Sequence, residues 1–199
     1  MTRRAEQVDE TRLRITEAAV RLHTTVGPSK TSIASVADEA GVTRLTVYRH
    51  FETLDDLFVA CTAHWRASHP APDALRWLSI PDQTERARAA FGDLYDWYRA
   101  NADDLFPINR DRAALPASAR LVAEERTAFL ADAILAGEAP GGPAGGQLIA
   151  VTRHLTEFLT WHALAIRGGL PRGEDADVAV RILAAFLDPR PGDREASRA

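Results

Sequence analysis

Cysteine is almost absent from this sequence, since Cys61 is the only one among 199 residues. A single thiol excludes a disulfide within the chain, and it cannot form a zinc site by itself. We interpret Cys61 as a small buried apolar side chain on a helix. A redox-sensing thiol is the alternative interpretation.

Long apolar runs are also lacking, and no stretch approaches the roughly 18 residues that a membrane-spanning helix needs. Residues 1–7 lack the apolar stretch of a signal peptide, so we expect a cytoplasmic protein with no membrane partner. An apolar content of 46% and a charged content of 26% indicate a globular chain, with one sizeable core or two small, closely packed domains.

The motifs of common catalytic and metal sites are missing as well. The sequence contains no H-E-x-x-H motif, no C-x-x-C pair and no G-x-S-x-G turn. His154 and Glu157 have a spacing compatible with metal ligands, but no further ligand accompanies them at a telling offset. Residues 140–146 are rich in glycine and proline but lack the Lys-Ser or Lys-Thr of a phosphate-binding loop. We therefore expect no catalytic residue, no metal and no cofactor.

Lysine is nearly absent too, with Lys30 the only one against 23 arginines. The net charge is −4, and residues 1–65 hold eight basic against nine acidic side chains. This region is therefore not a basic nucleic-acid module by bulk count. Lys30, Arg44 and Arg49 nevertheless fall near one short segment, which favours a local positive face.

Residues 31–51 form that segment and predict two short helices hinged at Gly41. The first helix should begin at Thr31 or Ser32, whose hydroxyls can accept a first-turn N–H. Glycine takes the left-handed backbone that ends a helix without the penalty that a Cβ carries. The inward face of the first helix follows from helical spacing, and it consists of Ile33, Val36, Ala37 and Ala40.

The second helix of the pair is predicted to begin with Thr43 as its cap and to turn Val47 and Phe51 inward. Its first turn is then exposed, as in a helix that enters the major groove of DNA. There Arg44 could make a bidentate contact to guanine, and Thr46 could bond a base edge or touch a thymine methyl. Three side chains further along lie where phosphate oxygens would pass: Tyr48, Arg49 and His50. On spacing alone, a helical protein that never contacts DNA remains the alternative.

The stretch from Thr11 to Trp65 resembles the N-terminal domain of the TetR family of transcription regulators. The matching motifs are Ile-Thr-Glu-Ala-Ala-Val-Arg-Leu-His at 15–23, Val-Gly-Pro-Ser-Lys-Thr at 26–31, Ala-Gly-Val-Thr at 40–43, Thr-Val-Tyr-Arg-His-Phe at 46–51, and Leu57 with Phe58. This resemblance implies a ligand-responsive regulator, by default a repressor, that binds a pseudo-palindromic operator as a homodimer and is not an enzyme. A constitutive or architectural DNA-binding protein is one alternative, and a helical ligand carrier or enzyme is the other.

The resemblance also implies operator contacts at the matching positions, and we add Lys30 and Arg49 because they lie close by. The candidate contact residues are Lys30, Thr31, Thr43, Arg44, Leu45, Thr46, Tyr48, Arg49 and His50. The sequence departs from the family at Leu54, where members often carry a lysine that meets a phosphate. We therefore expect a weaker phosphate grip from the helix that follows, with its N-terminal N–H groups alone to supply it.

We expect an all-α fold of about nine helices in two domains. Residues 1–52 form the predicted three-helix DNA-binding domain with its helix-turn-helix. Residues 53–187 form the predicted helical ligand-binding and dimerisation domain, with residues 53–68 as the connecting helix. Charged and small residues predict a disordered tail at 188–199.

The C-terminal part predicts four long helices, at 82–101, 117–136, 147–168 and 175–187. A break is predicted around Phe106 and Pro107. The 147–168 helix is apolar on two faces, of which one suits the core of the chain and the other needs a partner. We therefore expect a homodimer through residues 147–168 and 175–187. A fully buried helix in a monomer would show the same pattern.

Aromatic residues lie on several of these helices, so some of them must converge. In TetR-like proteins this region holds an inducer cavity, and an apolar lining with a few polar groups would suit a flat or hydrophobic small molecule. Ordinary core packing of the same side chains is the alternative. The candidate lining residues are Trp65, Tyr95, Tyr98, Phe106, Phe129, His154, Phe158, Trp161 and His162.

Overall fold

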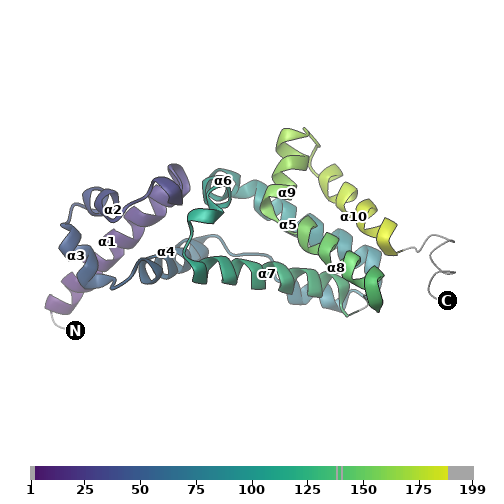
Figure 1. Ribbon diagram of the computed structural model, residues 1–199, viewed down its shortest axis with the longest axis horizontal. Coiled ribbons are helices and arrows are strands. Elements are labelled where there is room, and N and C mark those ends of the chain that lie inside the picture. Colours follow the sequence, from purple (N-terminus) through teal and green to yellow (C-terminus); the bar gives the residue numbers. More distant parts are fainter. Residues whose placement is uncertain (1–2, 138, 140, 188–199) are drawn as a thin grey trace. The chain divides into compact units, whose positions relative to one another are not determined.

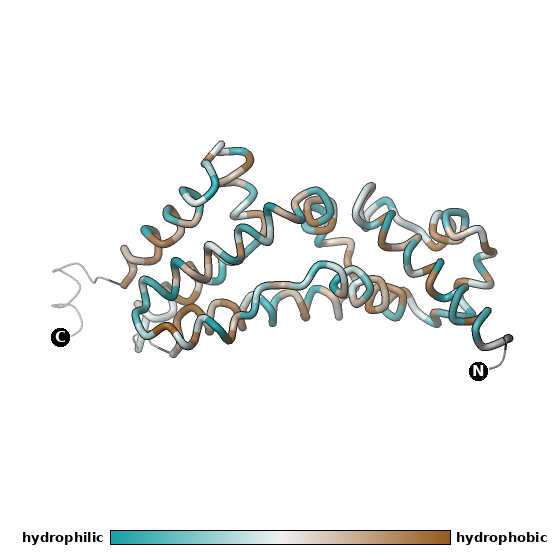
Figure 2. Tube along the Cα trace, turned by 180° about the vertical axis from the view of Figure 1, so that it is seen from behind, coloured by the Kyte–Doolittle hydropathy of each residue, from teal (hydrophilic) through white to brown (hydrophobic). Residues whose placement is uncertain are grey.

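The computed structural model describes residues 3–137, 139 and 141–187. Every regular element in these ranges is helical, which confirms the predicted all-α fold (Figure 1). Figure 2 shows apolar and polar residues alternating along the helices, the pattern of amphipathic helices that bury one face. No helix in the described ranges has both the length and the apolar character to cross a membrane. The tail predicted at 188–199 lies outside the described residues.

The chain divides into two compact units. The first unit comprises Met1–Ala71 with Asn101–Ala123, and the second comprises Pro72–Ala100 with Glu124–Ala199. The helix that corresponds to the predicted connecting helix at 53–68 belongs to the first unit. The functional division between residues 1–52 and 53–187 stays a prediction.

The first unit is built around its longest helix, α1 (Arg3–Thr25). The other elements of this unit are η1 (Pro28–Lys30), α2 (Ile33–Ala40), α3 (Arg44–His50), α4 (Leu54–Ser68), α6 (Ala102–Arg110), η3 (Arg112–Ala114) and the first turns of α7 (Ala117–Leu135). Helix α1 packs against α2, α4 and α6, and α2 packs against α3. The core of these helices consists of Ile15, Ala18, Ala19, Val36, Ala37, Ala40, Val47, Phe51, Leu57 and Cys61.

Cys61 lies in this core, which confirms its interpretation as a buried side chain. Its thiol donates to the carbonyl of Phe58 at 3.2 Å, and its sulfur lies 3.5 Å from Nδ1 of His23. Burial raises the pKa of the Cys61 thiol to about 12, so the thiol stays protonated at neutral pH. Because the thiolate is the reactive form, a thiol in this state is a poor redox sensor.

Residues 101–123 belong to the first unit although they follow its other helices by about 30 positions. Several polar contacts hold them to the N-terminal helices and loops. Among these contacts are Trp65 Nε1 to the Asp104 carboxylate at 2.7 Å, Arg110 Nη2 to the Val26 carbonyl at 3.0 Å, Ser29 to the Asp111 carboxylate, and the Ser118 hydroxyl to the Asp55 carboxylate at 2.8 Å. The α1 to α4 region is therefore supported by a segment from much later in the chain.

The second unit pairs α5 (Gln83–Ala100) with α10 (Glu174–Leu187). Its other elements are η2 (Ala74–Ser79), the remainder of α7, α8 (Gly142–Leu155), α9 (Phe158–His162) and the π-helical segment η4 (Ala163–Arg167). Arg86 of α5 is buried, and its guanidinium donates to the carbonyls of Ile134 at 2.8 Å and Ile80 at 2.7 Å. A cation that binds the last carbonyls of a helix stabilises its C-terminal end, here that of α7.

The prediction of one continuous helix over 147–168 is wrong. Helix α8 starts earlier and ends at Leu155, and the chain turns at Thr156 and Glu157 before it resumes as α9. The carbonyl of Leu155 accepts from the Tyr95 hydroxyl at 2.8 Å, and the carbonyl of Thr156 accepts from the Tyr98 hydroxyl at 2.6 Å. Two phenols from α5 thus satisfy carbonyl groups that a continuous helix would bond internally.

The predicted break around Phe106 and Pro107 is also wrong, because both residues lie inside α6. Proline removes one main-chain donor from a helix. Helix α6 is only nine residues long and packs against α1, and Pro107 is itself buried. This packing offsets the lost hydrogen bond.

Candidate nucleic-acid interface

Helix α2 begins with Ser32 as its cap, one of the two predicted positions. The Ser35 N–H donates to the Ser32 hydroxyl at 3.1 Å, and the Ser32 N–H donates to the Ser35 hydroxyl at 2.9 Å. This reciprocal pair satisfies two main-chain donors at the start of the helix. Thr31 has a different role, since its hydroxyl donates to the carbonyl of Gly27 at 2.9 Å.

Gly41 ends α2 as predicted, with the left-handed angles φ 65° and ψ 39°. The N–H of the next residue, Val42, donates to the carbonyl of Ala37 at 2.9 Å, which closes the end of the helix. A side chain in this backbone conformation costs about 1 to 2 kcal/mol, so the hinge favours glycine. The angle between α2 and α3 follows from this turn.

Thr43 caps α3 as predicted, and its hydroxyl accepts from the Thr46 N–H at 3.2 Å. Val47 and Phe51 are buried to 0% and 2% exposure, so they anchor the inner face of α3 in the core. The hydroxyls of Thr43 and Thr46 also bond each other at 2.9 Å. The first turn of α3 is therefore held rigidly from both its cap and its inner face.

The outer face of α3 is open to solvent. Leu45 is 61% exposed and Tyr48 is 52% exposed, and Arg44 and Arg49 are exposed as well. Within the part of the chain that the structure describes, the side chains of Arg44 and Tyr48 make no hydrogen bond or ion pair. A guanidinium and a phenol hydroxyl on one exposed helix face are available to bases or phosphates.

Arg12 of α1 holds the C-terminal end of α3 and was not predicted from the sequence. Its guanidinium carbon lies 4.1 Å from the centroid of the Phe51 ring, and Nη1 donates to the carbonyl of His50. The cation thus binds an end carbonyl of α3 and the aromatic ring that follows it. Because 38 positions separate Arg12 from His50, no local pattern indicates this contact.

Lys30 and Thr31 lie at the end of the η1 turn, with Lys30 exposed. This turn is held by Asp111, whose carboxylate accepts from both the N–H and the hydroxyl of Ser29. The Arg110 guanidinium and the Ser29 hydroxyl keep the pKa of the Asp111 carboxyl well below its usual range. Ser29 and Asp111 are therefore positioning residues for the turn that carries two of the candidate contacts.

The start of α4 is less suited to a phosphate than a bare helix N-terminus. Thr53 and Asp56 form a capping box, in which Asp56 accepts from the Thr53 N–H at 3.0 Å. The carboxylates of Glu52, Asp55 and Asp56 surround this turn in sequence, and Leu54 is 59% exposed. Like charges repel phosphate, so the N–H groups of this turn offer little compensation for the missing lysine.

These elements also carry the likeness to known proteins. The family model for bacterial regulatory proteins of the tetR family matches residues 15–61, which contain α2, Gly41 and α3. The HTH-type transcriptional regulator AcrR of Shigella flexneri is 44% identical over 59 residues, which are 29% of this chain and 27% of that protein. The chain belongs to the TetR family. The match to this curated relative nevertheless spans only about a quarter of the relative's length.

Solved structures extend the likeness beyond the N-terminal helices of this TetR-family chain. A tetR-family transcriptional regulator from Streptomyces coelicolor has a TM-score of 0.59 at 19% identity, covering 90% of this chain and 81% of that one. The multidrug binding protein EbrR, complexed with imidazole, has a TM-score of 0.54 at 26% identity and covers 92% of both chains. The TetR fold therefore covers most of the chain.

The candidate pocket residues of this TetR-family chain fall into different places. Tyr95, Tyr98, Phe158, Trp161 and His162 form one aromatic cluster in the second unit, where ring centroids lie 5.4 Å apart for Tyr98 and Phe158 and 5.8 Å for Phe158 and His162. Trp65 and Phe106 belong to the first unit, and Phe129 and His154 are exposed residues of the second. The ligand pocket stays a prediction.

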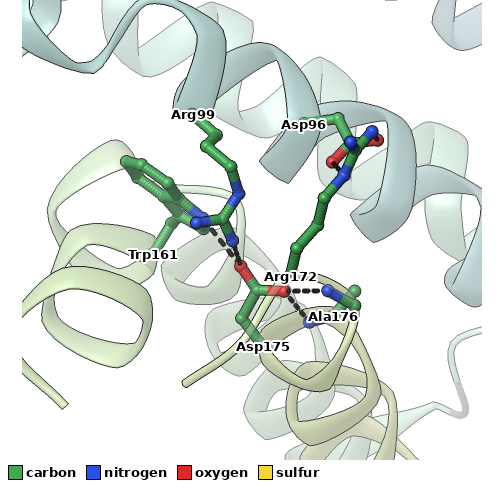
Figure 3. Close-up of polar contacts among 7 residues, drawn as sticks. Asp96, Arg99, Trp161, Arg172, Asp175 and Ala176 are labelled. Carbon is green, nitrogen blue, oxygen red and sulfur yellow. Dashed lines mark hydrogen bonds and ion pairs between the residues drawn. The ribbon is translucent and has the colours of Figure 1, made fainter. Parts of the chain in front are cut away.

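Asp175 is the polar centre of the aromatic cluster and was not predicted (Figure 3). It is 1% exposed, and its carboxylate accepts from Trp161 Nε1 at 3.0 Å and from Arg99 Nη2 at 2.5 Å. The N–H groups of Gly173 and Ala176 also donate to it. Asp175 thereby joins α5, α9 and α10, and no local pattern marks an aspartate in the first turn of a helix as buried.

The pair formed by His154 and Glu157 is exposed, with 3.9 Å between Nδ1 and the carboxylate. Among the described residues, no group of three His, Cys, Asp or Glu side chains has an arrangement that could hold a metal ion. Among the described residues, no third side chain thus joins His154 and Glu157 as a metal ligand.

Proposed function

We propose that this protein is a transcriptional regulator that binds duplex DNA through the outer face of α3. The observation that carries the proposal is the rigid α2, Gly41 and α3 arrangement, with Arg44, Leu45 and Tyr48 exposed on its outer face. Such a helix fits the major groove of B-DNA, with its first turn at the base edges. The family likeness over residues 15–61 supports the same function.

The operator is proposed to be pseudo-palindromic and to be bound by a homodimer. The two copies are proposed to contact each other through residues 147–168 and 175–187. Four large apolar side chains remain exposed in these segments, and they are Leu159 at 43%, Ile166 at 50%, Ile182 at 37% and Phe186 at 41%. A second copy would bury them. Two-fold symmetry would place the two α3 helices about 34 Å apart, in successive major grooves.

The effector is proposed to be a small, flat or hydrophobic molecule that binds the second unit and lowers DNA affinity, which makes the protein a repressor by default. The side chains of the aromatic cluster would form the apolar lining that such a ligand needs. The ligand must bind one conformation of the dimer better than the other, with a coupling of about 1 to 3 kcal/mol in typical cases. EbrR, described as a multidrug binding protein, supports this ligand class by likeness.

A constitutive DNA-binding protein is the second candidate, and one observation favours it. The polar atoms of Tyr95, Tyr98 and Trp161 all bond to groups of the chain itself. A cluster satisfied in this way can be a filled core. Ligand-dependent melting separates the two candidates, since a sensor gains thermal stability with an effector from an aromatic compound library and a filled core does not.

DNA binding itself is tested by gel shift with the region upstream of the gene that encodes this chain. The chain with Arg44→Ala and Tyr48→Phe should lose affinity and sequence preference at physiological salt. Arg88→Ala is the matched control, because it removes an exposed arginine from α5 and should leave binding unchanged. Unchanged affinity and preference in the double variant would contradict the assignment of α3. A monomeric mass at micromolar concentration would contradict the dimer.

A further inference from the structure

Leu45 is an apolar side chain at the centre of an exposed polar surface. It occupies the first turn of α3 and is 61% exposed, whereas Val47, two positions along, is 0% exposed. Tyr48 and Arg49 follow Leu45 by three and four positions, so the three side chains share one face of the helix. The face that would meet DNA therefore has an apolar group between polar ones.

A leucine side chain neither donates nor accepts a hydrogen bond, so it cannot read the polar edge of a base. In the major groove, the group that an apolar side chain can recognise is the 5-methyl of thymine. Arg44 precedes Leu45, and its side chain makes no hydrogen bond or ion pair within the described ranges, which leaves the guanidinium available to a neighbouring guanine or phosphate. We infer that Leu45 reads the 5-methyl group of one thymine in each half of the operator. This inference rests on the proposed function.

Thr46 also carries a methyl group, but its position makes it the weaker reader. Its hydroxyl bonds that of Thr43 at 2.9 Å, which orients the side chain back toward the cap, and the residue is only half-exposed. Leu45 has no such tie and extends further from the helix. The discrimination of thymine should therefore follow Leu45.

The test uses the full chain and a duplex that it enriches from a randomised library. Each thymine of that duplex is replaced in turn by deoxyuridine, which removes the 5-methyl and keeps base pairing. We expect the Kd of the unchanged chain to rise about fourfold for the methyl that Leu45 contacts, the amount that burial of one methyl supplies. Thymines elsewhere should be insensitive, and a dimer should show one sensitive thymine in each half-site.

Leu45→Ala should bind the thymine and deoxyuridine duplexes equally at that position. Leu45→Met keeps an apolar group and should retain the discrimination. Leu13→Ala is the matched control, since Leu13 is a leucine of α1 that is 46% exposed, and this variant should show the full fourfold effect. Circular dichroism shows whether each variant is folded.

Two results would overturn the inference while DNA binding stands. One is a duplex in which replacement of no thymine by deoxyuridine raises the Kd. This result can be obtained with the unchanged chain alone. The other is a sensitivity that persists at the same position in Leu45→Ala, which would assign the methyl contact to another side chain. A chain that enriches no duplex would instead overturn the proposed function, and the inference with it.

Discussion

The carboxylate of Asp111 accepts hydrogen bonds from both the N–H and the hydroxyl of Ser29, although 82 positions separate the two residues. Ser29 lies in the turn between α1 and α2, directly before Lys30 and Thr31. Asp111 follows α6, and the Arg110 guanidinium donates to the carboxylate from the other side at 2.7 Å. The turn that carries two candidate DNA contacts is thus held by the end of α6.

Gly27 is required by this arrangement. Its φ of 94° lies in the left-handed region, and a Cβ there would stand 2.3 Å from Oδ2 of Asp111 and 2.5 Å from Nη2 of Arg110. We expect Gly27→Ala to lower the free energy of unfolding by more than about 1 kcal/mol. Gly92→Ala is the control, because a Cβ at this position of α5 meets nothing within 4 Å and alanine favours helix by about 1 kcal/mol. Urea unfolding measures both, and equal stability of the two variants would contradict the contact.

Asp175 should be far more important for stability than its neighbour Asp96, although both pair with an arginine (Figure 3). Asp175→Ala leaves Trp161 Nε1 and two N–H groups without their acceptor and removes the partner of Arg99, at a cost of about 3 kcal/mol. Asp96→Ala removes an exposed ion pair with Arg172, worth less than about 1 kcal/mol. Thermal melting compares them, and a similar loss in both variants would contradict the account of the buried carboxylate.

His23 should make stability depend on pH. Burial lowers the pKa of His23 from 6.5 to about 4, so the unfolded chain takes up a proton on this residue at a higher pH than the folded chain does. The free energy of unfolding should therefore fall as the pH drops from about 6.5 toward 4. We expect His23→Gln to flatten this dependence between pH 7 and 5 in urea titrations. His64→Gln removes an exposed histidine of α4 and should keep it, so equal slopes in the two variants would count against the assignment.

Leu54→Lys should strengthen DNA binding and make it more sensitive to salt. The position matches a lysine that meets a phosphate in many TetR-family members, and Leu54 is 59% exposed. Each new phosphate contact should steepen the plot of log affinity against log salt concentration by about 0.9. Leu54→Ala should leave the slope unchanged. Identical slopes for the lysine and alanine variants would show that α4 does not approach the backbone of the DNA.

Local rules of helix capping were enough to predict the arrangement of α2 and α3. Gly41 and Thr43 act on residues three to five positions away, so their roles can be read from spacing. The break after Leu155 has a different origin. The carbonyl groups at this break accept hydrogen bonds from the hydroxyls of Tyr95 and Tyr98, which lie 60 and 58 positions away in the sequence. A continuous apolar pattern over 147–168 contains no sign of these donors.

In the candidate site, too, some features follow from local spacing and others depend on distant contacts. The exposed first turn of α3 follows from the position of its cap, and its side chains could be named from sequence. Arg12 of α1 holds the C-terminal end of α3, and Asp111, the residue after α6, holds the η1 turn through Ser29. Both act through contacts that only the fold creates. The burial of Asp175 depends likewise on Arg99 and Trp161, which lie on other helices.

The central claim is that the outer face of α3 binds DNA with sequence preference, and a competition titration tests it most directly. The full chain is titrated at physiological salt with the duplex from upstream of its own gene and with a scrambled duplex of equal length. We predict a preference of about a thousandfold or more for the upstream duplex, which the Arg44→Ala and Tyr48→Phe double variant should lose. Equal affinity for the two duplexes, or an unchanged preference in the double variant, would contradict the claim.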